Sequence, residues 1–178
     1  MPLKPLDLIV CLELAAGKEA HGTYEELAKS VGLSASEANQ AVQRAVQAGL
    51  LRPGANRREK PSANAEALLD FLEHGVRRAF FAVPGKTVRG MPTAQSAPPL
   101  NRLLGNDEES TFVWPDPEGI ARGQSIEPLY ETVPATARRN PALYELLALV
   151  DALRCGGARE RRLAMSELTR RIRDAERS

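Results

Sequence analysis

The chain has 178 residues, of which 43% are hydrophobic and 26% are charged, and its formal net charge is +1. This length suits one large domain or a small domain with an appended unit, and the composition is that of a globular protein. A near-neutral chain is not a polycation that coats nucleic acid without selectivity, so any DNA binding must come from a local basic patch. Aromatic residues make up only 4%, which leaves the core to Leu, Ala and Val and favours a mainly helical protein.

Two features of the chain bear on its cellular location. The two cysteines, Cys11 and Cys155, lie far apart and have no Cys or His at metal-ligand spacing, so neither a zinc site nor a disulfide framework is indicated. We expect both to be buried thiols in a reducing cytoplasm. The apolar run near the start contains Asp7 and Glu13, which argues against a signal peptide or a membrane span.

The first 50 residues predict three helices. Apolar residues at helical spacing predict a helix over residues 3–16. Two capping boxes follow, each with a hydroxyl residue and a glutamate three positions later, and they predict helices over residues 24–30 and 34–48. These boxes are Thr23 with Glu26 and Ser34 with Glu37. The break between the last two helices contains Gly32, which permits a tight turn.

Residues 50–60 predict a basic hairpin. Residues 50–52 are typical of a short strand, 53–56 of a turn and 57–60 of a possible returning strand. Between Arg44 and Lys60 there are five basic residues and a single acidic one. Such a concentration of positive charge is typical of a surface that contacts phosphates, although an exposed basic loop can also serve solubility alone.

The segment TYEELAKSVGLSASEANQAVQRAVQAGLLRP resembles the winged helix-turn-helix of MarR-like and related bacterial regulators, most closely in ELAKSVGLS and AGLLRP. The resemblance covers about residues 5–62. It implies an N-terminal winged helix-turn-helix with a small wing hairpin, in which the recognition helix (34–48) docks in the major groove of duplex DNA.

The outward side chains of residues 34–48 suit this role. Asn and Gln pair with adenine bidentately, Arg bonds guanine or phosphate, and Ser bonds phosphate or base edges. The basic wing (52–60) would reach backbone phosphates or the minor groove. The predicted DNA-binding residues are Ser34, Ser36, Asn39, Gln40, Gln43, Arg44, Arg57, Arg58 and Lys60. A merely solvated polar helix face is the alternative, and Glu37 is expected to cap its helix rather than to read a base.

No enzyme motif is found, and we predict no catalytic residue, no cofactor and no metal site. Residues 85–87 resemble the end of a phosphate loop, but Phe80 occupies the position where that pattern requires a glycine. His21 and His74 have no Cys or acidic partner at ligand spacing.

Residues 84–138 contain most of the chain's thirteen prolines and show no sustained periodicity. A long stretch of this kind is usually functional or disordered. Three interpretations remain open: a partner-binding arm, a strand pair packed on the N-terminal domain, and a disordered linker. Trp114 is the expected anchor in the first two, and we assign it as a partner-binding residue.

The C-terminal part predicts a helical pair over about residues 141–155 and 158–176, each helix with one apolar stripe. The domain organisation is therefore a winged helix-turn-helix domain (1–83), a proline-rich connector or arm (84–138) and a helical pair (139–178). The pair either forms a dimer interface, as two-fold operators require, or packs on its own chain.

The function predicted from these features is that of a sequence-specific transcriptional regulator that binds double-stranded DNA as a homodimer in the cytoplasm. An alternative is a protein-interaction module, such as an antitoxin or adaptor, that binds a partner protein through residues 84–178. A regulator that responds to a metabolite is a third possibility, and it would require an apolar pocket between the domains.

Overall fold

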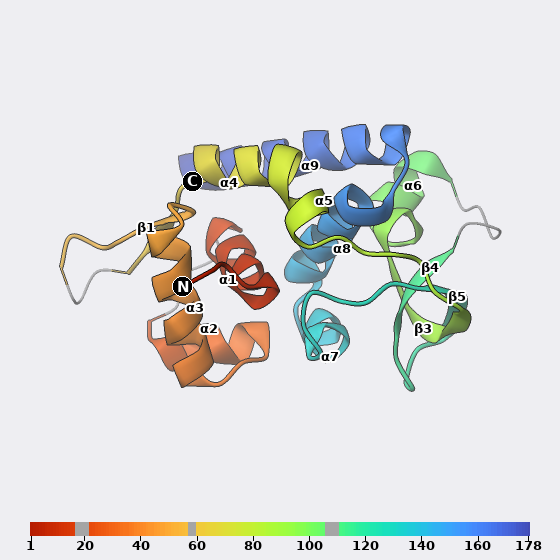
Figure 1. Cartoon of the computed structure of the whole chain (residues 1–178), viewed down its shortest axis with the longest axis horizontal. Helices are drawn as coiled ribbons and strands as arrows, with labels where there is room; N and C mark the ends of the chain where they lie inside the picture. The colour runs from red at the N-terminus through yellow and green to blue at the C-terminus, as the bar shows by residue number, and fades with distance from the viewer. Residues whose placement is uncertain (17–21, 57–59, 106–110) are drawn as a thin grey trace.

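The structure is a computed structural model and describes residues 1–16, 22–56, 60–105 and 111–178. It is mainly helical with two small sheets, as the composition predicts. Along the longest axis of the molecule, helices α1–α3 and a hairpin lie at one end, three strands lie at the other, and α8 lies between them (Figure 1).

The N-terminal helices begin and end where their local signals predict. They are α1 (Pro5–Ala15), α2 (Tyr24–Val31) and α3 (Ala35–Gln47). The Thr23 hydroxyl accepts a hydrogen bond from the backbone N–H of Glu26, and the Ser34 hydroxyl accepts one from that of Glu37, so both predicted capping boxes are present. Gly32 ends α2 with φ +73°, a left-handed conformation that favours glycine.

A two-stranded antiparallel sheet follows α3. Strand β1 (Leu51–Arg52) pairs with β2 (Ser62–Ala63), with Leu51 opposite Ala63 and Arg52 opposite Ser62. The hairpin is therefore wider than predicted, because the returning strand is 62–63 rather than 57–60. Residues 57–59 lie outside the part of the chain that the structure describes.

The chain then forms one long helical run with a change of pitch. Its parts are α4 (Ala65–Asp70), the π-helical turn η1 (Phe71–Gly75) and α5 (Val76–Ala79). The Asn64 side chain caps α4 by accepting a hydrogen bond from the backbone N–H of Ala67. A π turn inserts an extra residue into a helix and so redirects its face.

Residues 84–138 form a folded unit, so the prediction of a disordered linker is wrong for the part that the structure describes. The elements are β3 (Thr87–Thr93), the 3-10 turn η2 (Ala94–Ser96), α6 (Leu100–Leu104), β4 (Phe112–Pro115), β5 (Ala121–Ser125) and α7 (Val133–Arg139). Strand β3 is antiparallel to both β4 and β5, which pair in parallel to close a small barrel. Of the three interpretations, a packed strand pair is nearest to the structure. It differs in that η2 and β3 pack on α8 and not on the N-terminal domain.

Trp114 joins this barrel to α8 and is buried, with 1% of its surface exposed. Its indole Nε1 donates a hydrogen bond of 2.6 Å to Asp151 Oδ2, which also accepts one of 2.7 Å from the Thr93 hydroxyl. Arg154 forms an ion pair of 2.6 Å with the other oxygen of Asp151. The assignment of Trp114 as a partner-binding residue is therefore wrong, because a side chain enclosed in its own core cannot contact a partner.

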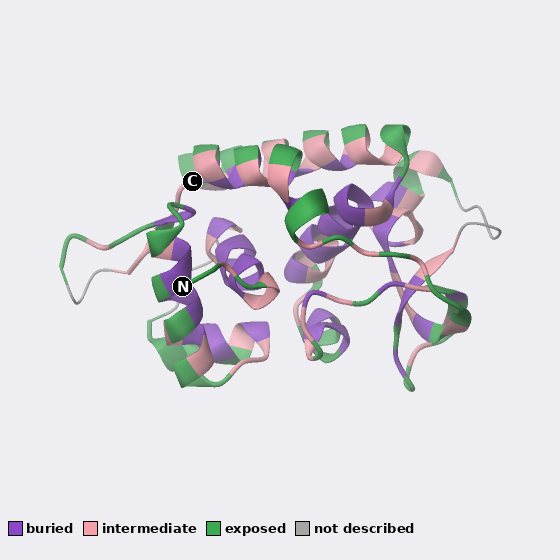
Figure 2. Cartoon of the chain, in the orientation of Figure 1, coloured by how far each residue is buried: buried purple, intermediate pink, exposed green. Residues whose placement is uncertain are grey.

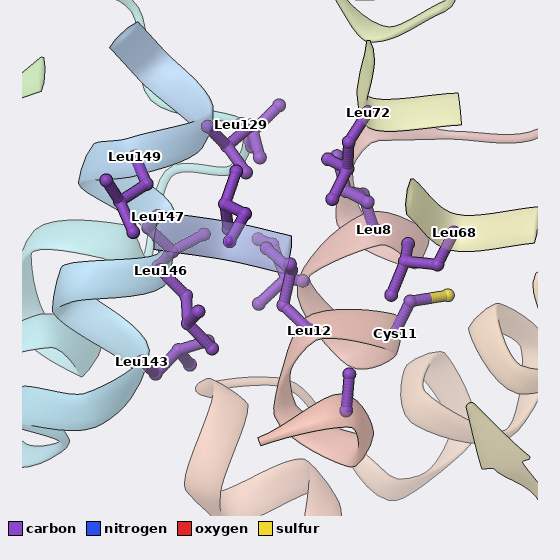
Figure 3. Close-up of a cluster of buried hydrophobic side chains, with 14 of the residues drawn as sticks. Leu8, Cys11, Leu12, Leu68, Leu72, Leu129, Leu143, Leu146, Leu147 and Leu149 are labelled. Carbon is purple, nitrogen blue, oxygen red and sulfur yellow. The ribbon is translucent and has the colours of Figure 1, made fainter. Parts of the chain in front are cut away.

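The C-terminal helices have the predicted bounds but their apolar stripes face inward. Helices α8 (Pro141–Cys155) and α9 (Ala158–Arg177) pack on each other, and residues 146–154 of α8 are buried. In Figure 3, Leu12 of α1 lies beside Leu146 and Leu147 of α8. The stripe of α8 thus packs on its own chain rather than on a second copy.

One hydrophobic core runs through all three of the parts predicted from the sequence. It includes Leu8 from α1, Leu100 and Trp114 from the middle segment, and Leu147 and Leu168 from the terminal helices. Figure 2 shows buried residues on the helices at one end of the molecule, on the strands at the other, and on α8 between them. Within the described ranges, no helix combines the length and the apolar character needed to cross a membrane.

Candidate nucleic-acid interface

Helix α3 buries one face and exposes a polar one. It packs on α1 and α2 through small apolar residues, of which Ala38, Ala41 and Ala45 are fully enclosed. The opposite face carries side chains that are polar but uncharged. Of these, Ser34, Ser36, Gln40, Gln43 and Gln47 are exposed and Asn39 is half-buried. The prediction that the polar side chains of residues 34–48 point outward is confirmed for these residues.

A shallow groove runs between this polar face and the start of α2. Tyr24 and Glu25 form one wall, and Ser36, Asn39 and Gln40 contribute to the other. Figure 1 shows α2 and α3 at the same end of the molecule as the hairpin. The polar face is therefore continuous with accessible surface and is not covered by another element of the described chain.

Two amides on this face are already oriented by each other. Gln43 Nε2 donates a hydrogen bond of 2.7 Å to Asn39 Oδ1 across one helical turn. The Asn39 amide nitrogen and the Gln43 carbonyl oxygen then remain as a neighbouring donor and acceptor. This combination matches the donor and acceptor that adenine presents in the major groove.

Glu37 caps α3 and does not face outward as a base reader would. Its carboxylate accepts hydrogen bonds from the backbone N–H and the hydroxyl of Ser34, at 2.8 and 2.7 Å, and from the Tyr130 hydroxyl at 2.9 Å. Hydrogen bonds from Ser34, and then from Tyr130, lower the pKa of Glu37. The sequence predicts the cap, but Tyr130 lies 93 positions away and carries no local signal.

One residue of the predicted DNA-binding set, Arg44, does not lie at the surface. Its side chain is buried, with 3% of its surface exposed, and forms a bidentate ion pair with the fully buried Asp7. The distance is 2.6 Å from Arg44 Nη2 to Asp7 Oδ1 and 2.8 Å from Arg44 Nε to Asp7 Oδ2. Hydrogen bonding to Asp7 raises the pKa of Arg44. The prediction that Arg44 points outward is wrong, because this guanidinium is neutralised inside the protein and reaches neither base nor phosphate.

The loss of Arg44 from the surface leaves α3 with no exposed cation. Any positive charge for phosphate contacts must then come from residues outside α3, and the described cations of the hairpin are Arg52 and Lys60. Arg52 is exposed, and its Nη2 donates a hydrogen bond of 3.2 Å to Asn64 Oδ1; Lys60 is half-exposed. The predicted contacts Arg57 and Arg58 lie outside the described residues.

The turn between α2 and α3 is covered by α7, a contact that the sequence does not reveal. A Cβ built on Gly32 would lie 2.2 Å from the Thr136 hydroxyl oxygen and 3.0 Å from that of Thr132. Together with the Tyr130–Glu37 hydrogen bond, this contact ties the start of α3 to the second half of the chain. Residues 130–136 thus add to the contacts that α3 makes with α1 and α2.

No protein-family model matches the chain, and neither does a curated protein or a solved structure. The resemblance to MarR-like regulators therefore stays a prediction. Among the described residues, His, Cys, Asp and Glu side chains do not gather in a group of three that could hold a metal ion.

Proposed function

We propose that the protein binds duplex DNA through α3 and the β1–β2 hairpin, in the manner of a winged helix-turn-helix regulator. The observation that carries this proposal is the exposed amide face of α3, next to a hairpin rich in Arg and Lys. The order of three helices followed by a two-stranded antiparallel hairpin is compatible with such a module.

In this proposal α3 enters the major groove and the hairpin lies along the backbone. Asn39, Gln40 and Gln43 would read base edges, since amides pair bidentately with adenine. Ser36, at the start of the helix, would contact a phosphate. The predicted contact through Ser34 is not retained, because its hydroxyl and its backbone N–H both donate to Glu37. Because α3 itself has no free cation, most of the phosphate contacts would come from the hairpin, and affinity would fall steeply with salt.

A dimer on a palindromic site would need a contact surface other than the buried stripes of α8 and α9. Those stripes already pack on their own chain. A homodimer therefore remains part of the proposal only through exposed surface, and the spacing of two half-sites by about one helical turn would reveal it.

Binding can be tested by fluorescence anisotropy on the DNA upstream of the gene and on an unrelated duplex, each at low and physiological salt. Selective binding that persists at the higher salt would support a site-specific regulator. Binding to neither duplex, or to both only at low salt, would contradict it.

Two matched pairs of variants locate the interface. Gln40→Ala should alter the preference among sequences, while Gln124→Ala, at an exposed glutamine on β5, should not. Arg57→Ala combined with Arg58→Ala should weaken binding to all sequences. The equally charged control, Arg173→Ala combined with Arg177→Ala at the exposed end of α9, should leave binding unchanged.

A further inference from the structure

A second concave surface lies between the helical run 65–79 and α9. Five arginines line it, with Arg77 and Arg78 from α5 on one side and Arg161, Arg162 and Arg170 from α9 on the other. We call this surface the arginine groove. Its volume is about 1130 Å³, which is at the upper limit of small-molecule sites and suits a segment of a macromolecule.

Most of the positive charge in the arginine groove is uncompensated. Within the described part of the chain, no carboxylate lies within ion-pair distance of Arg77, Arg78 or Arg162. Just outside the groove, by contrast, Arg171 pairs with Glu145 at 2.6 Å.

The remaining groove arginines have partners in the chain. Arg170 pairs with Glu167 at 2.8 Å, and Arg161 donates to the Gly156 carbonyl oxygen at 2.8 Å. The described lining contains a single acidic residue, Glu73, whose carboxylate is 3.6 Å from His74 Nε2. Like charges that face one another without counter-ions are repulsive, and an acidic ligand would relieve that repulsion.

The floor of the arginine groove is apolar. Leu72 and Leu153 belong to the core and line the groove, and Met165, which also lines it, is half-buried. Methionine adapts its shape to varied apolar partners. A fitting ligand therefore carries acidic groups toward the rim and at least one apolar side chain toward the floor.

We propose that the arginine groove docks an acidic amphipathic peptide segment of another protein. A helix in a groove is a common mode of peptide recognition, and arginine is enriched among the residues that dominate such interfaces. Duplex DNA fits less well, because its phosphate backbone offers no apolar side chain to cover Leu72, Leu153 and Met165. In Figure 1, α5 also lies nearer the middle of the molecule than α3 and the hairpin do.

The test is fluorescence anisotropy with a labelled helical peptide of glutamate and leucine repeats, compared with the same peptide in which glutamine replaces glutamate. The full-length protein should bind the acidic peptide and bind the neutral one at least about tenfold more weakly. Arg77→Glu combined with Arg162→Glu should weaken binding of the acidic peptide by about tenfold or more, since each exposed ion pair contributes up to about fivefold.

The control is Arg173→Glu combined with Arg177→Glu, which makes the same change in net charge at two positions of α9 outside the groove. It should change peptide affinity by less than about twofold. All four positions are exposed or at a helix end, and unchanged thermal unfolding would show that both variants fold.

Equal losses in the two variants would overturn the proposal, because binding would then follow net charge. Equal binding of the acidic and the neutral peptide would also overturn it. If the groove variant instead lost affinity for duplex DNA, the groove would be a phosphate-contacting surface. Failure to bind either peptide, with DNA binding through α3 intact, would reject this docking site without affecting the proposed function.

Discussion

Replacement of Arg44 by alanine distinguishes a buried structural pair from a DNA contact. The substitution leaves the Asp7 carboxylate, which has no exposed surface, without its counter-ion. Removal of one partner from a buried ion pair costs about 3–5 kcal/mol. Asp7 retains a hydrogen bond from the Lys4 backbone N–H at 2.8 Å, so we expect a loss near the lower end, about 3 kcal/mol.

In a protein of this size that loss lowers the melting temperature by about 6–12 °C. The assay is urea or thermal unfolding followed by circular dichroism. Gln43→Ala, one position away and exposed, is the control and should change stability by less than about 0.5 kcal/mol. Asp7→Leu combined with Arg44→Met removes both charges and should recover most of the stability.

The opposite pattern would refute the reasoning. If Arg44→Ala unfolded at the wild-type denaturant concentration but lost affinity for DNA, the guanidinium would act at the surface and the buried pair would be unimportant. If the double variant were no more stable than Arg44→Ala, the cost would not come from the isolated charge of Asp7.

Three further predictions concern the core and its titration. Gly32→Ala should destabilise the fold by about 2–4 kcal/mol in urea unfolding, because it combines a left-handed backbone with a clash against Thr136. Trp114 is the only tryptophan and is buried, so the fluorescence emission of the native protein should be blue-shifted. Asp151→Ala removes the hydrogen-bond acceptor of its indole, and should shift this emission to the red and lower the unfolding midpoint. Burial raises the pKa of the Cys155 thiol from 9.0 to about 12. Between these pH values the thiol is deprotonated in the unfolded chain and protonated in the native state, so the free energy of unfolding should fall as pH rises.

The first and the last of these predictions have a control on the same chain, and the second has an outcome that would contradict it. Gly49 also has positive φ, at +77°, but nothing lies within 4 Å of an added Cβ, so Gly49→Ala should cost about 1–2 kcal/mol from the backbone alone. Equal losses at Gly32 and Gly49 would contradict the contact with α7. A native emission maximum like that of free tryptophan would contradict the burial of Trp114. Cys155→Ala should make stability less dependent on alkaline pH, and an unchanged pH profile would show that the thiol does not contribute.

The parts of the fold that could be predicted from the sequence are those decided by contacts within about one helical turn. The caps at Thr23 and Ser34, the turn at Gly32 and the bounds of α8 follow from neighbouring residues. The polar face of α3 follows in the same way, because helical periodicity separates its alanines from its amides.

Contacts between distant residues decided the rest. Arg44 lies at the flank of the polar face of α3, and only the presence of Asp7, 37 positions earlier, makes it a buried residue. The same holds for Trp114, which lies in a proline-rich segment without periodicity. It is buried because β4 pairs with β3 and because Asp151, 37 positions later, accepts its N–H. Local propensity in short strands is weak, and the free energy that folds them comes from closing the barrel and burying it on α8. Which charges and rings face solvent was therefore determined by tertiary structure, as were α6 and α7 in the proline-rich segment. The sequence alone determined where α1, α2, α3, α8 and α9 begin and end, because their caps and periodicity are local.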